Sequence, residues 1–190
     1  MKERSMEIVV SPDPLLRQVC EPCEAGDKSL KALSKEMLKT MYANSGCGLA
    51  GPQVGVLKRI IVVDCSDEEE GRDPIVLINP TILELDGDPL VEEEGCLSCP
   101  GISVLVKRKP FVTVAYTDLE GEDWVIEGDG LLGRCLQHEI DHLDGKTLFE
   151  KCGPLERIKA LREYEEVLAA GAKPGEVSIN REAEKEAGNR

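Results

Sequence analysis

The chain contains only two histidines, and they lie four residues apart as His138 and His142. On a helix, residues four apart project from the same face, so both imidazoles can bind one metal ion. Glu139 directly follows the first histidine and is near enough to contact a water molecule on that metal. This spacing favours a helix at residues 138–142 and predicts that the helix carries a metal site.

Apolar residues recur around this motif every three or four positions, which is the spacing of one helix face. They predict a helix that starts near Gly130 and ends at Asp144-Gly145. Its apolar residues are Leu131, Leu132, Cys135, Leu136, Ile140 and Leu143. The same spacing predicts an earlier helix that starts near Asp27 or Ser29 and stops at Asn44. A third, charge-rich helix is predicted over residues 154–170.

The middle of the chain has the patterns of strands and turns. Residues 59–64 are a β-branched run typical of a buried strand, and residues 75–85 predict one or two strands with a kink at Asn79-Pro80. Residues 104–118 alternate in places and turn into another short strand at 124–126, which predicts an antiparallel sheet. Residues 46–53 are too rich in glycine to predict regular structure.

These elements predict an α+β fold: antiparallel β-sheets packed around the central histidine-bearing helix, with an N-terminal and a C-terminal helix. We expect a single catalytic domain over residues 1–170, because a chain of 190 residues favours one domain. Residues 171–190 lack aromatic residues and a periodic apolar pattern, so we expect a disordered tail.

The charge of the chain excludes some classes of partner. It has 37 acidic and 23 basic residues, a formal net charge of −14, which argues against a general DNA-binding or membrane-binding protein. The longest basic run, Lys107-Arg108-Lys109, is interpreted as the solvated start of a strand. No segment is apolar and long enough for a signal peptide or a membrane span, so we expect a cytoplasmic protein.

The eight cysteines are expected to be thiols or metal ligands in that compartment. The chain has two pairs of closely spaced cysteines, Cys20/Cys23 and Cys96/Cys99. The two pairs lie too far from each other in sequence to give more than weak support to a zinc ribbon. A cysteine in a core is most often a small apolar side chain, and we expect this of three of them: Cys47, Cys65 and Cys135.

Two histidines do not complete a catalytic metal site, which takes three protein ligands and leaves one position open. The candidates for a third ligand after the helix are Asp144, Glu150, Cys152 and Glu156. Upstream, Cys96 lies in a turn that contains glycine and could present a thiolate. Residue types and spacing alone leave these candidates open.

Three segments in order resemble peptide deformylase. Residues 46–53 read Gly-Cys-Gly-Leu-Ala-Gly-Pro-Gln, residues 94–98 read Glu-Gly-Cys-Leu-Ser, and residues 137–145 read Gln-His-Glu-Ile-Asp-His-Leu-Asp-Gly. The resemblance extends over residues 12–151. The one departure in the first motif is Gly51, where the family more often has alanine, and it removes no functional group.

The resemblance implies a metal-dependent hydrolase that removes the formyl group from the N-terminal methionine of newly synthesised polypeptides and releases formate. Its metal ligands would be Cys96, His138 and His142, and the resemblance implies Fe²⁺ in function, with Zn²⁺, Ni²⁺ or Co²⁺ as other bound ions. Glu139 would act as general base on the metal-bound water, and then as general acid toward the departing amine.

The resemblance also implies how the substrate is held. The side-chain amide of Gln53 and the backbone N–H of Leu97 would stabilise the oxyanion. Gly48 would line the substrate strand, and an apolar pocket for methionine would have Cys47, Leu131, Cys135 and the ring of His138 as walls. For Glu94 and Gln137, which flank ligands, support of the ligands and solvent exposure are equally open interpretations.

Two other interpretations compete with this one. A zincin-type peptidase would share the helix motif but would need a third ligand downstream. A structural metal site would need a fourth ligand, for which Cys99 is a candidate, and would leave Glu139 without a purpose. The expected partners are N-formyl-methionyl nascent peptides, with a transient ribosome contact suggested by the family, although the third helix has no clear basic face. A monomer is the default expectation.

Overall fold

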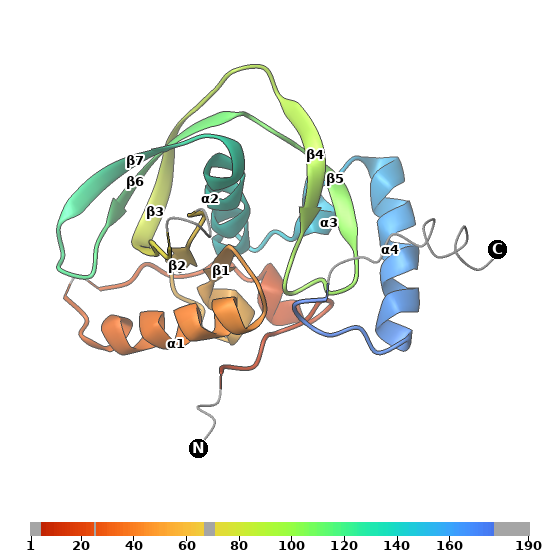
Figure 1. The fold of residues 1–190 in the computed structure, drawn as a ribbon, viewed down its shortest axis with the longest axis horizontal. Coiled ribbons are helices and arrows are strands. Elements are labelled where there is room, and N and C mark those ends of the chain that lie inside the picture. Colours follow the sequence, from red (N-terminus) through yellow and green to blue (C-terminus); the bar gives the residue numbers. More distant parts are fainter. Residues whose placement is uncertain (1–4, 25, 67–70, 177–190) are drawn as a thin grey trace.

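The computed structural model describes residues 5–24, 26–66 and 71–176 (Figure 1). Its helices, in chain order, are η1 (Pro14–Arg17), α1 (Ser29–Ala43), η2 (Gly51–Val54), α2 (Gly130–Leu143), α3 (Leu148–Lys151) and α4 (Pro154–Ala169). Its strands are β1 (Gly48–Ala50), β2 (Ile60–Val63), β3 (Ile75–Asp86), β4 (Leu90–Gly95), β5 (Ser103–Arg108), β6 (Phe111–Thr117) and β7 (Asp123–Gly128).

All strand pairs within the sheets are antiparallel. Five strands form one sheet in the order β1-β2-β3-β6-β7, and β4 and β5 form a separate two-stranded sheet. Figure 1 shows α2 at the centre of the molecule, between the larger sheet and the β4–β5 pair. The predicted α+β class, with antiparallel sheets around a central helix, is therefore confirmed.

The larger sheet is buried on both faces at β2. Alternate residues of a strand point to opposite faces. Ile61 and Val63 belong to one apolar cluster with α2, whereas Ile60 and Val62 belong to a second cluster with α1. This burial on both faces explains why β2 is a continuous run of β-branched residues rather than an alternating one.

The β4–β5 pair has its own apolar cover. Val104 and Val106 of β5 pack with Phe149 of α3 and with Tyr164 and Val167 of α4. The hydroxyl group of Tyr164 donates a hydrogen bond of 2.8 Å to the carbonyl oxygen of Ser11, which ties α4 to the N-terminal segment. The predicted C-terminal helix is confirmed, with bounds within a residue of the prediction.

Several predictions about local structure were wrong. Residues 48–54 form β1 and η2 instead of an irregular loop. The segment 104–118 is divided between β5 and β6, which belong to different sheets. The acidic strand β4 was not predicted, because five of its six residues are exposed and carry no apolar pattern. The kink predicted in β3 is confirmed: Asn79 has a φ of 50°, and the register with β6 shifts beside it.

The chain after α4 returns toward the centre of the molecule. The backbone N–H of Gly101 donates a hydrogen bond of 3.1 Å to the carbonyl oxygen of Glu176, the last described residue. The rest of the predicted tail, residues 177–190, lies outside the described residues. Among the residues that the structure describes, none of the helices is long and apolar enough to cross a membrane.

Candidate metal centre and active site

The structure brings together one thiol and two imidazoles from distant parts of the sequence. Helix α2 presents His138 and His142 on one face, with ring centroids 5.0 Å apart. Cys96 directly follows β4, and its Sγ atom lies 3.2 Å from Nε2 of His142. One ligand atom from each of the three residues lies within 4.8 Å of the others.

The surroundings of this group fit a divalent metal ion. In the described part of the chain, two buried side-chain atoms have no hydrogen-bond partner, and both are in this region: Oε2 of Glu139 and Nδ1 of His142. The neighbouring Cys99 thiol, together with burial, raises the pKa of Cys96 to about 11, so a thiolate here needs a cation beside it. Three protein ligands leave one tetrahedral position open.

His138 is held by a buried carboxylate. Its Nδ1 lies 3.1 Å from Oε2 of Glu94, which leaves Nε2 to face the metal position. Glu94 in turn accepts two hydrogen bonds from Arg108 (2.5 and 2.8 Å) and one from Arg134 (3.1 Å). Burial alone would raise the pKa of Glu94, but the hydrogen bonds from His138 and Arg108 and the charge of Arg108 lower it to about 2.

The prediction that residues 107–109 are solvated was wrong for Arg108, which is 5% exposed at the end of β5. Its guanidinium also donates to Oδ2 of Asp141 at 2.8 Å, and Oδ1 of Asp141 pairs with Lys151 at 3.1 Å. Strand alternation could have found it, because Arg108 shares its face with the buried residues Val104 and Val106. Arg108 thus links β4, β5 and α2, and through Glu94 it is connected to His138.

We expect Arg108→Met to lower the free energy of unfolding by about 3–5 kcal/mol, because it leaves Glu94 buried without its main partner. Urea unfolding of the two proteins would measure this. The matched control is Lys107→Met on the exposed face of the same strand, which should change stability by less than about 0.5 kcal/mol. Equal effects of the two substitutions would show that the buried ion pairs do not support the fold.

Gln53 lies on η2 and is 1% exposed. Its Oε1 accepts a hydrogen bond of 2.8 Å from the backbone N–H of Ala50. This bond fixes the orientation of the amide, so Nε2 points toward Cys96 Sγ at 3.5 Å and Ser98 Oγ at 3.2 Å. The amide nitrogen therefore faces the candidate metal centre on the side of Cys96.

Gly48 on β1 lies directly against helix α2. A Cβ atom at this position would lie 2.5 Å from Oε1 of Glu139 and 2.6 Å from Sγ of Cys135. Real Cβ atoms do not approach other atoms this closely, so only glycine allows β1 and the Glu139 side chain to pack in this way. Burial raises the pKa of Glu139 to about 8.

These groups open into one cleft of about 490 Å³. Of the sequence-predicted residues, the cleft is lined by Cys47, Gly48, Gln53, Cys96, Leu97, Leu131, Cys135, His138 and Glu139. His142 is not among the lining residues and is 1% exposed. Leu131 is 59% exposed and lies at the rim. The sequence did not predict Ile102, Arg134, Gly175 and Glu176 as further lining residues.

Gln137 and the downstream ligand candidates point elsewhere. Nε2 of Gln137 donates to the carbonyl oxygens of Lys109 and Gly133, so this buried side chain anchors α2 and does not touch a ligand. Asp144 pairs with Arg59 at 2.9 Å, and Glu150 pairs with Arg17 at 2.8 Å. The group around the histidines, as far as the described residues extend, includes neither of these carboxylates nor Cys152, Glu156 or Cys99.

Comparisons with known proteins agree with one another. The family model for polypeptide deformylase matches residues 5–158. A peptide deformylase of Thermodesulfovibrio yellowstonii is 49% identical over 152 residues, 80% of this chain and 92% of the relative. One from Rhizobium meliloti is 43% identical over 157 residues, 83% of this chain and 90% of the relative. A crystal structure of a peptide deformylase from Synechococcus elongatus in complex with actinonin superposes with a TM-score of 0.81 at 39% identity, covering 87% of this chain and 90% of that one.

Proposed function

The chain belongs to the polypeptide deformylase family, and on that basis we propose that it removes the formyl group from the N-terminal methionine of nascent polypeptides with the residues of the central cleft. The observation that carries this proposal is the convergence of Cys96, His138 and His142 beside a buried, unpaired Glu139 oxygen. Family membership supplies the reaction, and this geometry supplies the candidate machinery.

The metal would be held by Cys96 Sγ and the two imidazoles, with His138 oriented by Glu94. When bound, a divalent ion would supply a hydroxide near neutral pH and would polarise the formyl carbonyl group. One soft thiolate and two imidazoles suit several first-row ions. From the family resemblance we propose Fe²⁺ as the ion in function, with Zn²⁺, Ni²⁺ or Co²⁺ also able to bind.

Glu139 would carry the proton of the reaction. Its carboxyl group faces the cleft from α2, and no partner within the described residues occupies Oε2. An ionised carboxylate at this position accepts a proton from the attacking water and then donates it to the departing amine nitrogen. The packing of Gly48 against Oε1 keeps this side chain in one position.

Gln53 and Leu97 would stabilise the negative charge that develops on the formyl oxygen. The amide of Gln53 is already oriented by Ala50, so donating to the oxyanion costs little reorganisation. The backbone N–H of Leu97 would be the second donor, because Leu97 follows Cys96 directly and lines the same cleft. Gly48 would line the extended substrate, and Cys47, Leu131 and Cys135 would form the walls of the methionine pocket.

We expect Gln53→Ala to lower kcat by about 10²–10³-fold, which is the usual effect of removing one oxyanion donor. Steady-state formate release by the metal-loaded variant would measure this. Gln18→Ala, on the exposed surface, is the matched control and should leave kcat unchanged. A Gln53→Ala enzyme with normal kcat and raised KM would assign the amide to substrate binding instead.

The proposed function is tested by formate release from formyl-Met-Ala-Ser. The protein is purified anaerobically and reconstituted with Fe²⁺ or Ni²⁺, and unformylated casein is assayed in parallel. We expect metal-dependent formate and intact casein. A folded, fully metallated sample that releases no formate would contradict the proposal, and cleavage of casein would favour a peptidase. We expect this activity in the cytoplasm, by a monomer, on chains that emerge during transient contact with the ribosome.

A further inference from the structure

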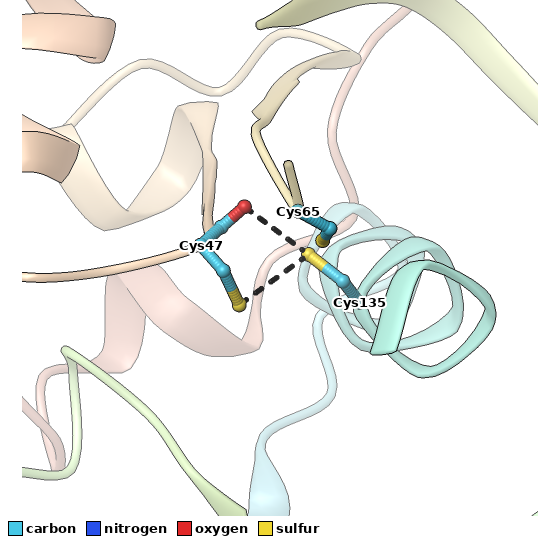
Figure 2. Close-up of side chains that lie close together, drawn as sticks. All are labelled: Cys47, Cys65 and Cys135. Atoms are coloured by element: carbon cyan, nitrogen blue, oxygen red, sulfur yellow. Dashed lines mark hydrogen bonds between the residues drawn. The ribbon is translucent and has the colours of Figure 1, made fainter. Parts of the chain in front are cut away.

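Three cysteines from separate parts of the chain meet beside the cleft (Figure 2). Cys47 immediately precedes β1, Cys65 follows β2, and Cys135 lies on α2. Figure 2 shows the three side chains pointing toward one another. Their Sγ atoms all lie within 4.8 Å of one another, and those of Cys47 and Cys135 are 3.9 Å apart. We call these three residues the thiol triad.

The sulfur–sulfur distances in the thiol triad are close to those of a metal–thiolate site. With Zn–S bonds of about 2.3 Å, two sulfur ligands of a tetrahedral ion are about 3.8 Å apart. The contact between Cys47 and Cys135 already has this separation, and the widest pair needs to close by no more than about 1 Å. Small side-chain rotations would therefore place all three sulfurs around one ion.

We propose that the thiol triad binds one thiophilic closed-shell cation, Zn²⁺ or Cu⁺, at a second site distinct from Cys96, His138 and His142. On binding, the cation forms bonds to three thiolate sulfurs, and the thiol protons are released to solvent. Zn²⁺ would complete its coordination with a water molecule from the cleft, whereas Cu⁺ takes three sulfurs alone. Both ions share the same preference for thiolate ligands.

The electrostatics of the thiol triad favour one thiolate among the three sulfurs. The sulfur of Cys135 and then that of Cys65 stabilise the thiolate form of Cys47, and this lowers its pKa. Hydrogen bonding to Cys47 raises the pKa of Cys135 in turn. One sulfur is thus favoured as a thiolate, and the two thiols around it are the groups that a cation would deprotonate.

The position of the thiol triad also gives a cation access. Buried cysteines are usually small apolar side chains, which is how the sequence analysis interpreted these three. The structure agrees in part: Cys135 is buried in the same apolar cluster as Cys20, and Cys47 and Cys65 pack against that cluster. Unlike Cys20, however, Cys47 and Cys135 also line the cleft, through which an ion can approach the triad.

Occupancy of this site would affect deformylation, and this part of the inference rests on the proposed function. Cys47 and Cys135 are two of the proposed walls of the methionine pocket, and the sulfur of Cys135 lies beside Gly48, as does the carboxyl group of Glu139. A cation there would draw the walls together and add positive charge near the general base. We therefore expect added Zn²⁺ or Cu⁺ to inhibit deformylation.

The test counts ions per chain by native mass spectrometry of the Ni²⁺-loaded enzyme, with excess Zn²⁺ or Cu⁺ added in separate arms. We expect two ions per chain in the wild-type protein with at least one of the added cations, and one ion in Cys65→Ser. Cys65 is outside the proposed catalytic machinery, so this variant should keep its deformylase activity. Cys152→Ser, a thiol outside the triad, is the matched control and should keep both ions.

A second measurement does not depend on any variant. Alkylation by iodoacetamide, followed by peptide mass spectrometry, should show Cys65 and Cys47 protected by the added cation in the wild-type enzyme. One ion per chain in all proteins, or two ions in Cys65→Ser, would overturn the proposal. So would a Cys47–Cys135 disulfide that forms in place of a second ion. Ion counts do not involve the substrate, so their result is independent of the result of the deformylase assay.

Discussion

Glu139→Ala is expected to lower kcat/KM for a formylated peptide by about 10²–10⁴-fold while the protein keeps its metal ion. The substitution removes the proposed proton carrier but none of the three candidate ligands. It also removes a buried carboxyl group whose Oε2 has no partner among the described residues, so the fold should not depend on it. Formate release and metal content per chain, measured on the same sample, would show the two effects separately.

A control variant and a conservative variant test whether Glu139 acts by proton transfer. Glu127→Ala removes an exposed carboxylate on β7 and should leave both activity and metal content unchanged. Glu139→Gln keeps the shape of the side chain but not its basicity, so it should be as inactive as the alanine variant. An active Glu139→Gln enzyme would show that shape, not proton transfer, is what this position contributes. A Glu139→Ala protein without metal would make the residue a support of the metal centre.

Cys96→Ala is expected to lose the catalytic metal and, with it, the deformylase activity. The substitution removes the only thiolate of the three-residue group and leaves two imidazoles. Changes to residues that merely support a ligand cost about 10–100-fold in metal affinity, so the loss of a ligand should exceed that range. Competition with a chelator would measure the affinity, and thermal unfolding should lose the stabilisation that the metal gives to the wild-type protein.

Cys20 provides the matched control for Cys96. It is buried in an apolar cluster and does not line the cleft, so Cys20→Ala should keep the metal and most of the activity. Retention of one ion and of full activity in Cys96→Ala would mean that another group completes the site. Because Asp144 and Glu150 are paired with Arg59 and Arg17, recruiting either one would require breaking an observed ion pair.

The parts of the fold that the sequence predicted are those with a strong local pattern. Helix α2 has apolar residues at helical spacing and a glycine-containing stop, and both of its ends lie where the pattern places them. Strand β4 has no such signal, because its order comes from pairing with β5 rather than from its own side chains. Local periodicity therefore does not reveal an exposed, charged strand.

The candidate site was likewise predicted only where the sequence has a local pattern. The two histidines could be paired from spacing alone, because a helix fixes their relation. Cys96 could not, since its approach to His142 depends on how β4 and its following loop pack against α2. Arg108 was missed for a similar reason: a charged residue in a basic run is usually solvated, and only the tertiary positions of Glu94 and Asp141 make its burial favourable.

Helix α2 packs against β1, β2, β3, β6 and β7, and it also carries two candidate ligands and the candidate base. A fluctuation that displaces the backbone of α2 at either histidine would therefore disturb the main apolar cluster of the protein. Movement of this helix is then expected to be coupled to global unfolding. The backbone amides of α2 should accordingly be among the slowest in the molecule to exchange with deuterated solvent.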